Sequence, residues 1–69
     1  MTSTEVEALV RNVIVHHGLP FAILAVAAAP YGWSVKVRAG TGGTVSFTVP
    51  DGRPVSMRVL IQEKLEAGL

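Results

Sequence analysis

Hydrophobic positions recur along the first 18 residues with the period of a helix. Hydrophobic residues and one histidine recur at i, i+3, i+4, i+7, i+8 and i+11, the single stripe of an amphipathic helix. The stripe consists of Val6, Leu9, Val10, Val13, Ile14 and His17. Thr4 and Glu7 have the spacing of a capping box, Glu7 and Arg11 form a favourable i, i+4 pair, and Gly18 suits the left-handed position after a helix. The pattern predicts a first helix that begins near Thr4 and ends at Gly18.

The next segment, FAILAVAAA at residues 21–29, has no polar residue at all. Its alanines and the preceding Pro20 favour a helix. Its length of nine residues between two prolines, and its Phe, Ile and Val, favour a strand instead. Hydrophobic residues on both faces are typical of a central strand that is covered on both sides. We expect a strand here, with a helix as the alternative.

Residues 33–49 alternate with period two and are divided by glycines. Hydrophobic side chains face one way in the sequence WSVKVRA and again in TVSFTV, and opposed residues of a hairpin share a face. The pattern predicts a hairpin in which Val37 lies opposite Phe47 and Val35 lies opposite Val49. The connection is then the three-residue loop TGG at 41–43, a length that commonly includes a glycine bulge.

The sequence PDGRP at 50–54 breaks the alternation, and a second helical stripe follows over residues 55–67. The stripe consists of Met57, Leu60, Ile61 and Leu65, with Lys64 among them extending its charged end outward. Gly68 ends the helix. The sequence therefore predicts one α+β domain over residues 1–69 with the order α-β-β-β-α: a three-stranded antiparallel sheet with two helices packed on one face.

Composition adds a prediction about assembly. Hydrophobic residues are 49% of the 69 residues, and with the seven glycines they exceed half of the chain, above the usual ~45–50%. No charged residue occurs between Asn12 and Val35, and three valines lie off the two helical stripes: Val15, Val55 and Val59. Hydrophobic patches of this kind mark interfaces. We therefore expect a homodimer or larger homo-oligomer.

The uninterrupted apolar part of this uncharged segment is too short to span a membrane. This part, LPFAILAVAAAP, is well below the roughly 20 residues that a spanning helix needs. A signal peptide would have a basic segment before its apolar run, whereas here an acidic amphipathic segment precedes it. The chain has no cysteine, which fits a reducing compartment. We expect a soluble cytoplasmic protein without a membrane partner.

Positive charge is concentrated in the middle of the chain, although the net charge is only +1. Lys36 and Arg38 fall on the polar side of the first hairpin strand, and Arg53 and Arg58 flank the start of the second helix. If they share one edge, these four cations are candidate contacts to nucleic-acid phosphates. Four contacts release only about four counterions, so the binding should be weak and should fall steeply with salt.

Other chemistry has little support in the sequence. His16 and His17 are adjacent, so on a helix their side chains diverge by about 100° and are poorly placed to share a metal; we interpret His17 as a structural residue of the core or the helix end. The GTGG sequence at 40–43 lacks the Lys-Ser/Thr and the helix of a phosphate-binding loop. Trp33 faces the core by its parity. We expect no cofactor, no metal and no evident small-molecule substrate.

The α-β-β-β-α order at this length resembles two families over essentially the whole chain. One is the double-stranded RNA-binding domain, whose second helix contacts phosphates through lysines; the corresponding stretch here, GRPVSMRVLIQEKL, offers Arg53 and Arg58. The other is the HicA-type toxin family of messenger-RNA-cleaving domains, which this chain resembles in HHG at 16–18, PDGR at 50–53 and the closing MRVLIQEKLEAGL. That family has its catalytic histidine near the turn between the first two strands, where this chain has Pro30, Tyr31 and Gly32.

The sequence therefore predicts a small non-enzymatic binding module that contacts RNA through a basic sheet face and the edge of a helix. One alternative is a protein-interaction or regulatory homodimer that binds no nucleic acid. A second is a HicA-like ribonuclease, which would require His16 or His17 to reach a concave site.

Overall fold

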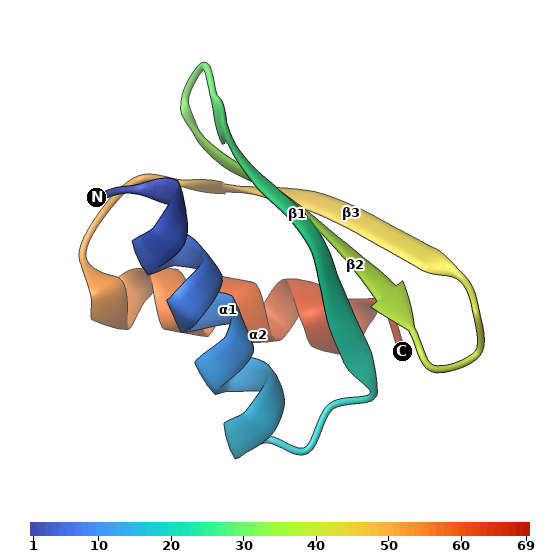
Figure 1. Ribbon diagram of the computed structural model, residues 1–69. Helices are drawn as coiled ribbons and strands as arrows, with labels where there is room; N and C mark the ends of the chain where they lie inside the picture. Colours follow the sequence, from blue (N-terminus) through green and yellow to red (C-terminus); the bar gives the residue numbers. More distant parts are fainter.

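The computed structural model describes residues 1–69 and confirms the predicted order of elements. Its elements are α1 (Ser3–His16), β1 (Phe21–Ala29), β2 (Gly32–Ala39), β3 (Thr44–Pro50) and α2 (Pro54–Ala67). The three strands form one antiparallel sheet, and both helices lie on the same face of it (Figure 1). The fold is therefore an α+β fold of two layers. Neither helix is long and apolar enough to cross a membrane.

Helix α1 begins earlier than the sequence pattern suggested. Its N-cap is Thr2, whose hydroxyl accepts from the Glu5 N–H at 3.2 Å while the Glu5 carboxylate accepts from the Thr2 N–H at 2.9 Å. The predicted capping box of Thr4 and Glu7 is therefore wrong. Both pairs have the required spacing, but the earlier start adds backbone hydrogen bonds, and Glu7 instead accepts from Arg11 at 2.7 Å.

The end of α1 follows the prediction. Gly18 has φ of 60°, a left-handed conformation in which a glycine has no Cβ penalty, and the chain then turns toward the sheet.

Strand β1 is confirmed over residues 21–29, but it is an edge strand and not the central one. The strand order is β1-β2-β3, so β2 is central. A bulge between Ile23 and Ala25 shifts the register, and as a result Ile23 and Val26 both pack against the core. The two hydrophobic faces of β1 had suggested cover on both sides; in the structure only one face is covered.

The hairpin of β2 and β3 forms with a register two residues away from the predicted one. Val35 lies opposite Phe47, and Val37 lies opposite Val45. The left-handed glycine of the loop is Gly42, at φ of 96°, so the connection is residues 40–42 and not 41–43. A shift of two residues leaves every side chain on its predicted face, because side chains alternate with period two.

The core lies between the sheet and the helices and contains only hydrophobic side chains. Its nine buried members are Val6, Val10, Val13, Val35, Val37, Val49, Met57, Ile61 and Leu65. Both predicted helical stripes contribute three residues each, and Lys64 is exposed as expected. Because this core is small for 69 residues, hydrophobic side chains elsewhere remain open to solvent.

Candidate functional site

The outer face of the sheet, which no helix covers, includes two of the four predicted cations. Lys36 and Arg38 are exposed on β2, where Val35 and Val37 alternate with them and are fully buried. Ser46 lies opposite Lys36 on β3. Thr44 and Thr48 extend this row of exposed hydroxyls. On this face, the basic side chains therefore lie on β2 and the hydroxyls lie beside them on β3.

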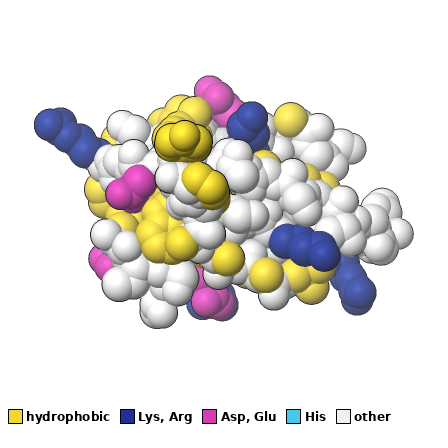
Figure 2. Space-filling view, turned by 90° about the horizontal axis from the view of Figure 1, so that it is seen from above, with side chains coloured by type: hydrophobic (Ala, Val, Ile, Leu, Met, Phe, Trp, Pro, Cys, Tyr) yellow, Lys and Arg dark blue, Asp and Glu magenta, His cyan; other side chains and the backbone are white.

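The other two predicted cations lie elsewhere. Arg53 is the exposed N-cap of α2. Arg58 lies on α2 and lines a hollow between the two helices, on the opposite side of the sheet from Lys36 and Arg38. The structure therefore divides the four cations between surfaces and does not bring them to one edge. Seen from above, two neighbouring basic groups lie toward the right and others lie at the top and upper left, with hydrophobic side chains between these places (Figure 2).

The free edge of β1 is a feature that the sequence pattern did not reveal, because β1 was interpreted as central. β1 pairs only with β2, so the backbone groups along its other edge have no hydrogen-bond partner in the chain. The strand has nine residues without a charge or a proline. Its outer-face side chains are small and exposed at Ala22, Ala25 and Ala27, and Leu24 at the bulge is 47% exposed.

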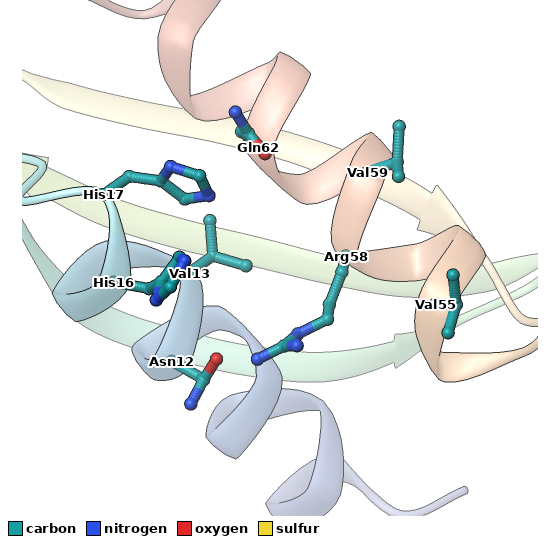
Figure 3. Close-up of a pocket in the computed structure, with 8 residues that line it drawn as sticks. All are labelled: Asn12, Val13, His16, His17, Val55, Arg58, Val59 and Gln62. Atoms are coloured by element: carbon teal, nitrogen blue, oxygen red, sulfur yellow. The ribbon is translucent and has the colours of Figure 1, made fainter.

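A second feature is a hollow of ≈ 280 Å³ between the C-terminal half of α1 and the N-terminal half of α2 (Figure 3). His16 and His17 line it, and both are exposed. Their rings meet edge to face with centroids 5.0 Å apart. Of the two structural positions expected for His17, the core is wrong, because the residue is exposed, and the helix end is confirmed, because His17 is the C-cap of α1.

The polar lining of this hollow comes from both helices. Arg58 extends from α2 toward Asn12 of α1, while His17 and Gln62 approach from the other end (Figure 3). None of these side chains has a hydrogen-bond or ion-pair partner within the chain. No carboxylate is among the lining residues. The hollow thus combines one permanent cation, two imidazoles and two amides.

The histidine pair lies far from the turn at which HicA-type proteins have their catalytic histidine. The β1–β2 turn is at one end of the molecule, and the C-terminal end of α1 is at the other (Figure 1). No three His, Cys, Asp or Glu side chains are close enough together to hold a metal ion. The GTGG stretch forms the β2–β3 turn and leads into a strand.

Comparison with known proteins adds no further information. No family model, no curated protein and no solved structure matches this chain.

Proposed function

We propose that this protein is a non-enzymatic protein-interaction module that associates with a second copy of itself through the edge of β1. The observation that carries this proposal is the open β1 edge: nine residues without a charge or a proline, and with unpaired backbone groups. Natural proteins protect edge strands with charges, prolines, bulges or a covering element, because an open edge is a template for pairing, and of these β1 has only its bulge between Ile23 and Ala25.

The edge of β1 is better suited to pairing than the edge of β3. Strand β3 has seven residues, ends in Pro50, and exposes hydroxyl side chains. β1 is longer and exposes alanines, whose small side chains let another backbone approach closely. Leu24 adds an exposed hydrophobic side chain at the centre of the strand.

A second copy of the chain is the partner that this edge fits. Two β1 strands that meet antiparallel around a two-fold axis bring no like charges together, since the strand has none. The result is a continuous six-stranded sheet with all four helices on one face. The pairing satisfies the backbone of both edges at once and covers part of the hydrophobic surface that a 69-residue core leaves exposed.

Sedimentation equilibrium tests this proposal. The chain mass is 7.3 kDa, and we expect twice that mass for the native protein. The variant Ala25→Lys/Ala27→Lys places like charges on both copies of the edge and should be a monomer with an unchanged circular dichroism spectrum. Thr48→Lys, on the same face but on β3, is the matched control and should remain a dimer. A native protein that sediments as a monomer at high concentration, or equal loss of the dimer in the control, would refute the proposal.

A second candidate function is weak RNA binding through the outer face of the sheet. It is favoured by one observation: Lys36 and Arg38 are exposed on an uncovered face beside the hydroxyls of β3. Two phosphate contacts predict low affinity with a shallow salt dependence, roughly half of that expected for four. The test is a salt-titrated assay with double-stranded RNA that compares the native protein with Lys36→Glu/Arg38→Glu. Absence of binding at low salt would remove this candidate.

A further inference from the structure

The hollow between α1 and α2 has the chemistry of an anion site. Its polar lining consists of Arg58, His16, His17, Asn12 and Gln62, and every one of these side chains offers a nitrogen that can donate a hydrogen bond. A guanidinium is always charged and presents a planar fork that matches two oxygens of a phosphate or carboxylate. The lining contains no carboxylate to neutralise that charge.

We propose that this hollow binds a phosphate group. Arg58 is the anchor, because it makes no ion pair in the chain and its side chain reaches across the hollow toward α1 (Figure 3). His17 and the amide of Gln62 supply donors from the other end, and His16 lies between them and Asn12 (Figure 3). The volume of ≈ 280 Å³ is ample for a phosphate group, since one water in the liquid takes about 30 Å³.

The surroundings of the hollow are compatible with an anion. The C-terminal end of a helix carries partial negative charge, but here the last carbonyls of α1 are occupied: those of Val13, Ile14 and Val15 accept hydrogen bonds from the N–H groups of residues 17, 19 and 18. The Glu5 carboxylate lines an adjoining hollow that Arg58 and Asn12 also line. That carboxylate already accepts a hydrogen bond from Thr2.

Titration of the labelled protein with inorganic phosphate at constant ionic strength, followed by NMR, tests the site. We expect saturable shifts of the side-chain amides of Asn12 and Gln62 and of the backbone at residues 16–18. Arg58→Gln should weaken the binding about tenfold or more, as expected for loss of a charge-assisted contact. Arg53→Gln, which removes another exposed cation that does not line the hollow, should leave the affinity unchanged. His16→Gln/His17→Gln should also weaken it, and the fold should persist because both rings are exposed.

Two further arms distinguish the sources of the phosphate. Titrations with adenosine monophosphate and with a short RNA oligonucleotide, at equal phosphate concentration, compare a terminal phosphate with the backbone of a nucleic acid. Tighter binding of either one supports the site and names its ligand. Shifts that are spread over the whole surface, or that are the same in Arg58→Gln and Arg53→Gln, would overturn the proposal. The proposal does not depend on self-association, and the monomeric Ala25→Lys/Ala27→Lys variant should bind phosphate equally well.

Discussion

The indole N–H of Trp33 donates a hydrogen bond to the carboxylate of Asp51 over 3.1 Å. Trp33 lies near the start of the central strand β2, half-buried against the core, and Asp51 follows the last residue of β3. The bond therefore joins the sheet to the segment that leads into α2. It also explains why Trp33 is not a free stacking surface: the indole packs against the core, and its polar atom is already paired.

Removal of the acceptor should loosen this connection. We expect Asp51→Ala to lower the free energy of unfolding by about 0.5–1.5 kcal/mol, the usual contribution of one hydrogen bond. Trp33 is the only tryptophan, so its fluorescence reports directly on the change and should shift to longer wavelength. Asp51→Asn keeps an acceptor oxygen and should behave nearly as the native protein does. Equal effects of the two substitutions would show that the hydrogen bond contributes nothing.

Gly32 should tolerate no side chain. A Cβ at this position would overlap the carbonyl oxygen of Val49 and lie 2.7 Å from the Cα of Pro50, and both are backbone atoms that cannot move cheaply. We expect Gly32→Ala to destabilise the fold by about 1–3 kcal/mol or more, measured by urea unfolding. Gly43→Ala is the matched control, because no heavy atom beyond its chain neighbours lies within 4 Å of the place that its Cβ would take. Similar urea midpoints for both variants would contradict this account of the turn.

Ile61 on α2 is fully buried in the core that lies between the sheet and the two helices. Ile61→Ala should lower the free energy of unfolding by about 2–5 kcal/mol, and Ile61→Val by about 0.5–1.5 kcal/mol, because the alanine leaves the larger cavity. In so small a domain the alanine variant should be largely unfolded at room temperature, as seen by circular dichroism. Val59→Ala, on the same helix at a 52% exposed position, should change stability little. A stable, cooperatively folded Ile61→Ala would show that the core is organised differently.

The capping box of α1 should make stability depend on pH. Hydrogen bonds from Thr2, above all from its backbone N–H, lower the pKa of Glu5 below its ordinary value of 4.5. The ionised carboxylate therefore favours the folded state. Its stabilisation is fully present above the ordinary value and is lost as the pH falls through the lower pKa of the folded protein.

Glu5→Gln tests this dependence, because glutamine preserves the geometry of the capping box without titrating. The native protein should be more stable than the variant near neutral pH, and the difference should shrink as urea unfolding is measured at progressively more acidic pH. Glu63→Gln, at an exposed position without a hydrogen-bond partner in the chain, is the control. A difference between the native protein and Glu5→Gln that stays constant with pH would contradict the prediction.

Local patterns were sufficient to predict the order of the elements and the buried face of each one except β1. Two helical stripes can be read from the period of 3.6 in residues 6–14 and 57–65, and two strand faces from the alternation in residues 33–49. The buried core residues of the structure lie on these stripes and faces. The exposure of Lys36 and Arg38 followed from the same alternation. The two-residue error in the hairpin register changed no face, because it preserved parity.

Relations between elements were decided only by the tertiary structure. The hydrophobic sequence of β1 is equally compatible with a central strand and with an edge strand, since its own residues do not record how many neighbours it has. Arg58 and the two histidines lie on different helices that are separated in the chain by the whole sheet, and only the packing of α1 against α2 brings them around one hollow. The same packing separates Arg58 from Lys36 and Arg38, because the sheet lies between them. Sequence periodicity specifies which side of an element is buried, whereas the neighbours of its exposed side depend on the arrangement of all five elements.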